Sequence, residues 1–459
     1  MFEDTIAAVS TPIGAAGIGI VRISGKKSIK IVETVFKSKK NKRISESPNY
    51  TILYGHIMDE QNEVVDEVLL SIMRGPNSFT AEDVIEINCH GGIIAVKKTL
   101  EIVLNAGARL AEPGEFSKRA FLNGRIDLAQ AESIIDLINA KTEKSLQVAV
   151  HQLEGTLSGK IKLLSGELLG LMAQIEAGID FPEHDIEEVS RVQISSKTKV
   201  ILEEIEKMID SANTGRVLRE GLRTVIIGKP NVGKSSLLNA LLREKRAIVT
   251  EIPGTTRDVI EEVVSLKGIP LKIIDTAGIR ETNDIVEKIG VEKSKAVSIE
   301  ADLILLMIDA STGITNDDLQ LLPLLNRKKC LIIINKIDLK EKFDYLEIEK
   351  NLGEYEVIET SLVKGQGLEQ LENKIEELVY SGMVTSNDDV MVTNIRHRNS
   401  LERTAESLKN VLSGLEGQLP TDCIAIDLKA AWDALGEITG ESIGEDLVDQ
   451  IFSRFCIGK

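Results

Sequence analysis

The spacing of hydrophobic positions changes along this sequence, and each change marks an expected domain boundary. Residues 1–118 contain short β-branched runs that alternate with helical stretches, and Gly or Pro separates them. We expect strands at 18–23, 64–72 and 84–88 and a helix at 93–105. The sequence therefore predicts a mixed α/β domain at 1–118.

Further along the chain, apolar residues recur at spacings of three and four, which is the period of an amphipathic helix. One such stripe predicts a single long helix, and its members are Leu153, Leu157, Ile161, Leu164, Leu168, Leu171 and Ile175. A second stripe near the end consists of Leu401, Leu408, Val411, Leu412 and Leu415. We therefore expect one discontinuous helical domain, formed by 119–215 and 381–459, around an inserted domain at 216–380.

The inserted segment contains short, continuous apolar runs with helical segments between them. Buried parallel strands have this pattern because both of their faces are covered. The runs are 224–227, 271–274, 303–308, 331–334 and 357–360. They predict a doubly wound α/β sheet, so the chain is expected to combine α/β and all-α domains.

Composition agrees with an ordinary globular chain, since 42% of the 459 residues are hydrophobic and 28% are charged. The N-terminus has no leader pattern and no apolar run could cross a bilayer, so we expect a cytoplasmic protein with no membrane contact. Four cysteines without a CxxC pair and five histidines indicate neither a disulfide framework nor a zinc site. The adjacent Cys89 and His90 lack a second ligand pair.

The net charge of −17 argues against broad nucleic-acid binding but remains compatible with a local basic docking face. The basic run at 36–43 is expected to be a solvated loop. The glycine-rich opening GAAGIGIVRISG leads into an expected strand. A dinucleotide-binding loop would instead leave a strand and enter a helix, so we exclude that motif.

A phosphate-binding loop is the clearest chemical motif. Residues 228–235 read GKPNVGKS, which matches GxxxxGK[ST] between an expected strand and an expected helix. Backbone N–H groups of such a loop and the helix N-terminus after it bind phosphates. Lys234 is expected to reach the β- and γ-phosphates, and Ser235 to ligate Mg²⁺. The expected nucleotide contacts here are Asn231, Val232, Gly233, Lys234, Ser235 and Ser236.

Two further motifs place groups around the γ-phosphate. The DTAG motif supplies Asp275 for the Mg²⁺ shell and the Gly278 N–H for the γ-phosphate. The GTTRD motif supplies Thr256 as a further Mg²⁺ ligand. The other nucleotide contacts expected in these motifs are Thr255, Thr276 and Ala277.

A fourth motif, NKID at 335–338, selects the base. The Asp338 carboxylate can accept hydrogen bonds from N1–H and the 2-amino group of guanine, and adenine has neither donor. Asn335 and Lys336 complete the motif, and Ser361 stands where the last guanine-contacting loop should be. The four motifs together predict a GTP-hydrolysing enzyme, and Asp338 disfavours an ATPase.

The water-positioning group for hydrolysis is not evident from these motifs. Ras-like switches carry a glutamine directly after DxxG that orients the attacking water, and this chain has Ile279 there. The group must come from elsewhere, and residues 280–287 offer several polar candidates.

Several long stretches resemble the MnmE (TrmE) family of tRNA modification GTPases. They are DTIAAVSTP, GIVRISG, NCHGG, EPGEFSKRAFLNGRIDLAQAE, GKPNVGKSSLLN, GTTRD, DTAGIRET, NKID and FCIGK. The resemblance implies a homodimer with an N-terminal tetrahydrofolate-binding and dimerisation domain, a helical domain and an inserted Ras-like P-loop GTPase domain. It also implies a heterotetramer with the FAD-binding MnmG (GidA) subunit. That assembly installs a carboxymethylaminomethyl-type group at C5 of the tRNA wobble uridine, with a 5-formyl- or methylene-type tetrahydrofolate as one-carbon donor.

The same resemblance implies roles for single residues. Glu287 matches the family's water-orienting glutamate, and potassium (K⁺) takes the place that an arginine finger has in other GTPases. The positions that match the K⁺ site are Asn231, Thr250, Ile252 and Thr255, and Thr250 also matches a GTP contact. The positions that match the folate site are Arg22, Glu82, Arg125 and Lys459. Cys456 matches the family's C-terminal cysteine, for which a buried structural thiol and a direct role remain alternatives.

Two functions stay open at this point. One is a modification enzyme in which GTP hydrolysis drives a conformational cycle. The other is a regulatory or ribosome-assembly GTPase, which would share the P-loop, DTAG and NKxD motifs. The charge of −17 and the lack of an appended basic RNA-binding domain disfavour the second function.

Overall fold

The computed structural model describes most of the chain, and its contacts divide the chain into two compact units. The first unit comprises Met1–Ile135, Leu153–Lys162 and Leu435–Lys459, and the second comprises Asp136–Gln152 and Leu163–Ala434. The described residues are 3–180, 187–245, 262–274, 300–325, 329–339, 352–353, 355–380 and 390–459.

The first unit is built on a seven-stranded sheet with the strand order β3-β4-β5-β6-β2-β1-β7. Neighbouring strands are antiparallel except for β1 and β7, which pair in parallel. The predicted strands at 18–23, 64–72 and 84–88 lie within β2, β5 and β6. The strands are β1 Ile6–Val9, β2 Ala16–Ser24, β3 Phe36–Ser38, β4 Thr51–Met58, β5 Val64–Met73, β6 Val84–Gly91 and β7 Arg109–Leu110.

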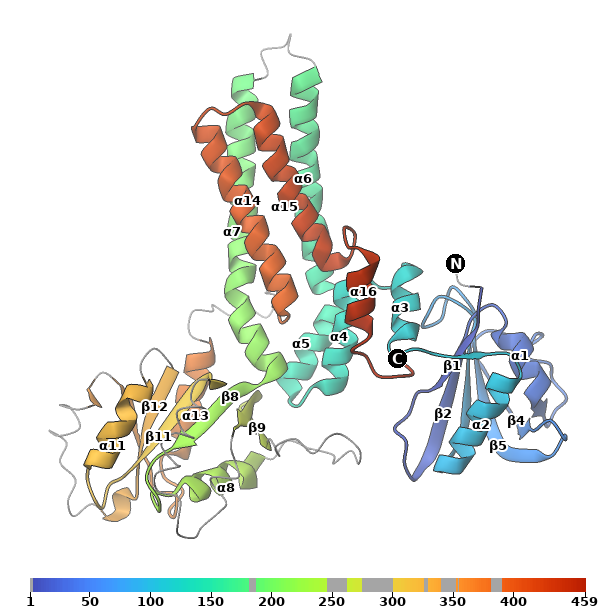
Figure 1. Ribbon diagram of the computed structural model, residues 1–459, viewed down its shortest axis with the longest axis horizontal. Helices are drawn as coiled ribbons and strands as arrows, with labels where there is room; N and C mark the ends of the chain where they lie inside the picture. The colour runs from blue at the N-terminus through green and yellow to red at the C-terminus, as the bar shows by residue number, and fades with distance from the viewer. Residues whose placement is uncertain are drawn as a thin grey trace. The chain divides into compact units, whose positions relative to one another are not determined.

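The two faces of this sheet have different coverings. Helices α1 (Ser28–Val35) and α2 (Ile93–Asn105) pack on one face, where alternate strand residues such as Val21 and Ile87 form a single core with them (Figure 1). Because side chains alternate along a strand, Arg22 projects from the opposite face of β2. Polar side chains can therefore gather on that face without entering the core.

The end of the chain packs against helix α3 (Glu115–Leu122) within the first unit. Phe452 of α16 (Glu445–Phe452) is buried in a cluster with Ala120 and Leu128. Gly114, just before α3, has φ +69°, and a Cβ there would lie 2.5 Å from the Phe452 carbonyl oxygen. The C-terminal helix is thus held against α3 by close packing.

The second unit contains a six-stranded sheet with the order β13-β12-β11-β8-β10-β9, parallel except for the antiparallel β9–β10 pair. Alternate residues of β11 enter two separate cores, Leu305 on one face and Leu306 on the other. The predicted doubly wound sheet is confirmed. Its strands are β8 Leu222–Ile227, β9 Glu262–Leu266, β10 Ile269–Ile273, β11 Leu303–Asp309, β12 Lys329–Asn335 and β13 Glu356–Glu359.

Helices cover this sheet, and further helices precede and follow the segment that forms it. Within the described residues, the helices beside the sheet are α8 Lys234–Lys245, α11 Asn316–Leu321 and α13 Leu368–Tyr380, with a 3₁₀ turn at Leu322–Leu325. The others are α4 Leu128–Asn139, α5 Glu143–Leu153, α6 Thr156–Asp180, α7 Glu187–Glu220, α14 Ile395–Glu416 and α15 Thr421–Thr439. Long helices α7 and α14 pack side by side (Figure 1). No helix of the described ranges is long and apolar enough to cross a membrane.

The junction between helices and sheet in the second unit is polar as well as apolar. The Ser145 hydroxyl on α5 donates to the Leu218 carbonyl oxygen near the end of α7, at 2.6 Å. Glu376 on α13 forms ion pairs with Lys144 of α5 at 3.5 Å and with Lys267 of the β9–β10 turn at 3.0 Å. These contacts fix α5 against the edge of the sheet that carries β9 and β10.

Two sequence-based expectations about local structure are wrong in part. The apolar stripe does form one long buried face on α6 from Leu157 to Ile175, but its first expected member, Leu153, belongs to α5, because the left-handed backbone at Gly155 (φ +92°) separates the two helices. The basic run at 36–43 is not all loop. Its first residues form β3, because Phe36 is buried in the sheet core opposite Ile57, whereas residues 39–43 are exposed as expected.

We predict that Gly215→Ala destabilises the protein although it lies inside α7. Gly→Ala in a helix normally stabilises by about 1 kcal/mol, but a Cβ at Gly215 would overlap the backbone carbonyl of Val392. The overlap should reverse the sign and cost about 1–3 kcal/mol. Thermal unfolding should show a lower Tm. The control is Gly166→Ala on α6, where no atom lies within 4 Å and Tm should rise; a rise in both variants would contradict the packing argument.

Candidate functional site

The predicted phosphate loop connects the end of β8 to the start of α8, as its motif requires. Its backbone takes left-handed conformations at Gly228 (φ +148°), Asn231 (φ +60°) and Gly233 (φ +109°). A Cβ at Gly228 would lie 2.5 Å from the Met307 carbonyl oxygen, and one at Gly233 would overlap the Asn335 amide. The two glycines are therefore required by close packing against the ends of β11 and β12.

Lys234 and the two serines after it occupy the first turn of α8. The Lys234 ammonium donates to the carbonyl oxygens of Gly228 at 2.6 Å and Lys229 at 2.7 Å. Burial lowers the pKa of Lys234. Ser235 and Ser236 are exposed at the N-terminus of α8, where backbone N–H groups favour an anion.

The NKID motif is tied directly to this loop, although about a hundred residues separate the two motifs along the chain. The Asn335 amide donates to the Val232 carbonyl oxygen at 2.9 Å, and its own oxygen accepts from the Thr360 hydroxyl at 3.2 Å. Lys336 donates to the Asn231 carbonyl oxygen at 2.8 Å and pairs with Asp309 at 2.6 Å. These contacts hold the loop in its left-handed shape.

Asp338 lies exposed in a 3₁₀ turn, Ile337–Leu339, beside buried Ser361. The Ser361 hydroxyl donates to one Asp338 carboxylate oxygen at 2.6 Å, which lowers the pKa of Asp338. The carboxylate is thereby kept ionised and ready to accept from a base edge. Ser361 itself is fixed by backbone hydrogen bonds with Gln366.

The remaining nucleotide and K⁺ residues expected from the sequence lie outside the described residues. Their roles stay predictions. They are Thr250, Ile252, Thr255, Thr256, Asp275, Thr276, Ala277, Gly278 and Glu287, together with Ile279.

In the first unit, three of the four predicted folate residues converge. The Arg22 guanidinium stands 5.2 Å from the Phe79 ring centroid, and that of Arg125 stands 4.9 Å from the same ring. Burial lowers the pKa of Arg125, and burial together with the nearby charge of Arg22 lowers the pKa of Lys459. Glu86 is close enough to Arg22, at 2.8 Å, to neutralise one of the three cations.

The backbone of the C-terminal tail contacts this group of cations. The Gly458 carbonyl oxygen accepts from Arg22 at 3.1 Å and from the Ser10 hydroxyl at 3.1 Å. Gly458 has φ +89°, and a Cβ there would overlap the Val9 backbone, so the tail lies directly on β1. Cys456 is exposed, which does not fit the expectation of a buried structural thiol.

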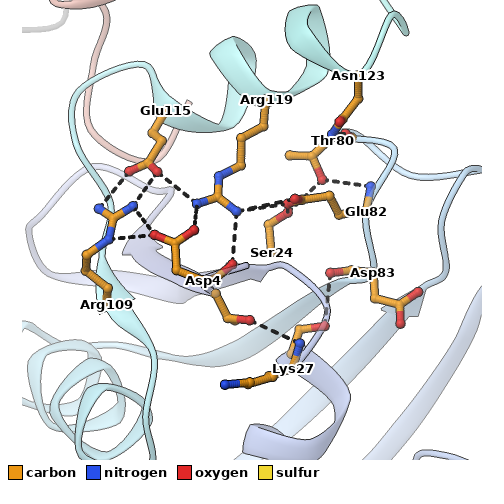
Figure 2. A network of polar contacts seen from close by, with 12 residues as sticks. Asp4, Ser24, Lys27, Thr80, Glu82, Asp83, Arg109, Glu115, Arg119 and Asn123 are labelled. Atoms are coloured by element: carbon orange, nitrogen blue, oxygen red, sulfur yellow. Dashed lines mark hydrogen bonds and ion pairs between the residues drawn. The ribbon is translucent and has the colours of Figure 1, made fainter. Parts of the chain in front are cut away.

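The fourth predicted folate residue, Glu82, belongs to a neighbouring polar network (Figure 2). Its carboxylate accepts from the Ser24 hydroxyl at 2.7 Å and from fully buried Arg119 at 3.3 Å. Arg119 also pairs with Asp4 at 2.8 Å and with Glu115 at 3.0 Å. Glu82 is thus held by Arg119 on the sheet face that carries Arg22.

Sequence reasoning missed several residues that shape these two sites: Phe79, Glu86, Arg109, Arg119, Lys229, Asp309 and Asp318. A signal existed for Glu86, which is the one charged position in the run VIEIN of an expected strand. Apart from Glu115, one helical turn earlier, the partners of Arg119 come from the β5–β6 connection and the N-terminus, so no local signal identified the network.

Comparison with known proteins connects this geometry with one family. A family model described as "GTP-binding protein TrmE N-terminus" matches residues 5–125, and one described as "MnmE helical domain" matches residues 128–456. Three proteins named "tRNA modification GTPase MnmE" are similar over essentially their whole length. The one from Alkaliphilus metalliredigens is 55% identical (100% of this chain, 99% of that protein), that from Desulforamulus reducens 56% (100% of both), and that from Bacillus licheniformis 49% (99% and 100%).

The Figure 2 network predicts a defined acid sensitivity. Burial alone would raise the pKa of Asp4 and Glu115, but their hydrogen bonds to Arg109 and Arg119 hold both below the ordinary value. A carboxylate with a depressed pKa stabilises the fold above its unfolded pKa, and that contribution disappears as the pH falls through the folded pKa. For these two groups the loss lies below about pH 4.5.

Arg109→Gln tests this relation, because Arg109 pairs with both carboxylates at 2.6 Å. The variant should have a lower Tm at neutral pH, and between about pH 4.5 and pH 3 it should lose less stability than the wild type, as followed by calorimetry. The control is Lys98→Gln, which removes an exposed pair with Glu101 at 3.7 Å and should behave as wild type. Equal pH dependence of all three proteins would show that the network does not depress these pKa values.

Proposed function

This chain belongs to the MnmE family of tRNA modification GTPases, and on that premise we propose a K⁺-dependent reaction cycle with a folate-linked modification site. Membership makes the chain a GTP hydrolase that acts in tRNA modification. The proposal adds that it works with the FAD-binding MnmG subunit. Together they would install a carboxymethylaminomethyl-type group at C5 of the tRNA wobble uridine, with a tetrahydrofolate as one-carbon donor.

The loop held between the strand ends supports the proposed nucleotide roles. Lys234 would contact the β- and γ-phosphates, and Asp338, kept ionised by Ser361, would accept from guanine. Asn335 and Lys336 would act through the loop backbone, since both donate to its carbonyl oxygens. Glu287 would orient the attacking water, because Ile279 has no group that can.

The chemistry of the residues fits two metal ions. Ser235 is exposed at the start of α8, where its hydroxyl could ligate Mg²⁺ beside the phosphates, and Thr256 would be a further ligand. Asn231 is exposed, and Lys336 donates to its backbone carbonyl oxygen. The side-chain oxygen of Asn231 could therefore ligate K⁺, which prefers oxygen ligands. A bound K⁺ would supply positive charge between the phosphates. The other proposed K⁺ positions are Thr250, Ile252 and Thr255.

The cation group of Arg22, Arg125 and Lys459 is the observation that best supports folate binding. A reduced folate carries a planar ring and carboxylates. Guanidinium groups pair with carboxylates in a bidentate manner, and an aromatic ring such as Phe79 offers a stacking surface. Glu82, held in place by Arg119, would accept from N–H groups of the ring. The exposed thiol of Cys456 lies on the same tail as Lys459 and is a candidate for a direct role.

The proposed organisation follows the family. It comprises a folate-binding and dimerisation domain at 1–118, a helical domain at 119–215 and 381–459, and a G domain at 216–380, within a cytoplasmic homodimer that joins MnmG in a heterotetramer. Helix α7 runs through the boundary at 215 to Glu220, and β8 begins at Leu222. A change in the G domain would therefore reach the helical part through a continuous helix.

Folate binding can be tested with the full-length protein. Titration with 5-formyltetrahydrofolate, followed by calorimetry, should show saturable binding. Arg125→Met should weaken it about tenfold or more, because a charge-assisted hydrogen bond is lost. Lys98→Met, at an exposed position of α2, is the control and should bind as wild type. Absence of saturable binding, or equal binding by the Arg125 variant, would count against the proposed site while leaving the GTPase assignment intact.

A further inference from the structure

Lys229, the second residue of the phosphate loop, has a side chain that leaves the loop and is anchored elsewhere. Its ammonium lies 2.8 Å from an Asp318 carboxylate oxygen and donates to the Thr315 hydroxyl at 2.9 Å. Asp318 is in the first turn of α11, and Thr315 is the N-cap of that helix. A contact therefore runs from the phosphate loop to the beginning of α11.

The burial of this ion pair distinguishes it from an ordinary surface pair. The exposed fraction is 16% for the Lys229 side chain and 1% for that of Asp318. Exposed pairs contribute little because water and salt screen them, whereas removal of one partner of a buried pair leaves an uncompensated charge. Lys229 and Asp318 are therefore strongly dependent on each other.

Asp318 also caps the N-terminus of α11, because it forms a capping box with Thr315. One of its carboxylate oxygens accepts from the Thr315 backbone N–H at 2.9 Å and from the Thr315 hydroxyl at 2.8 Å, in addition to pairing with Lys229. The other oxygen is buried and has no hydrogen-bond partner within the described residues. Within the part of the chain that the structure describes, the charge of Lys229 compensates this carboxylate from outside the first turn of α11.

The backbone of Lys229 has a second role, because its carbonyl oxygen accepts from the Lys234 ammonium at 2.7 Å. The same residue is thus bound to α11 by its side chain and to the phosphate-contacting lysine by its main chain. Asn335 and Lys336 hold the loop only at Val232 and Asn231. Lys229 provides a separate attachment at the beginning of the loop.

We propose that Lys229 is a positioning residue for GTP hydrolysis and that its ion pair with Asp318 sets the geometry of the phosphate loop and of Lys234. Loss of the pair lets the first part of the loop move, so Lys234 no longer stands where the γ-phosphate must be stabilised in the transition state. Misplacement of a catalytic group by about 1 Å can slow a reaction as much as a hundredfold.

The test compares four variants of the full-length protein with wild type: Lys229→Met, Asp318→Asn, the double variant and Lys229→Arg. Steady-state GTP hydrolysis gives kcat and KM, and thermal unfolding is recorded for each. We expect kcat to fall by about tenfold or more in Lys229→Met, with a smaller change in KM. The double variant should be no slower than the slower of the two single variants, and Lys229→Arg should recover most of the lost rate.

Lys374→Met is the matched control. Lys374 lies on helix α13, outside the phosphate loop, and its ammonium forms an ion pair with Glu356 of β13 at 2.7 Å. The control variant should keep the wild-type kcat. The proposal is overturned if Lys229→Met keeps the wild-type kcat. It is also overturned if the loss of rate in Lys229→Met merely follows a loss of folded protein at the assay temperature, or if the effects of the two single substitutions simply add.

Discussion

The phosphate loop can keep its shape because side chains from several strand and helix ends bind its backbone carbonyls. A loop that points its N–H groups inward must turn its carbonyls outward, and buried carbonyls need donors. Asn335 and Lys336 supply donors at Val232 and Asn231, and Lys234 supplies one at Gly228. The sheet makes these contacts possible, since the neighbouring parallel strands β8, β11 and β12 have their carboxyl ends at the same edge.

A comparable dependence of charges on each other organises the first unit. Arg119 is fully buried, and its charge would strongly destabilise the fold without the carboxylates of Asp4, Glu82 and Glu115 around it. Asp4 and Glu115 hold Arg119 in place, and Arg119 in turn fixes Glu82 on the sheet face that carries Arg22. The tail that ends in Lys459 then closes on β1 and β2, so residues from both ends of the chain form one cationic site.

Local sequence patterns predicted the elements well and the long-range contacts poorly. The expected helix at 93–105 coincides with α2, and the five apolar runs of the inserted segment lie in or overlap β8, β10, β11, β12 and β13. The period of the apolar stripe placed Leu153 on the same helix as the later members, but the left-handed backbone at Gly155 separates α5 from α6. The contact of Arg22 with Gly458 joins positions 436 residues apart, and no local pattern encodes such a pairing. The P-loop and NKID residues could be predicted because their spacing itself reflects phosphate and guanine chemistry, and the structure brings the two motifs together.

The proposed K⁺ dependence is tested most directly by steady-state GTP hydrolysis of the purified protein in KCl and in NaCl at equal ionic strength. In the proposal, the phosphate loop presents Asn231 to a monovalent cation, which supplies the charge that an arginine finger supplies in other GTPases. We expect strong activation by KCl and its loss in Asn231→Ala. Equal rates in the two salts would contradict the cation role of Asn231, although the nucleotide site built by Lys234 and Asp338 would stand.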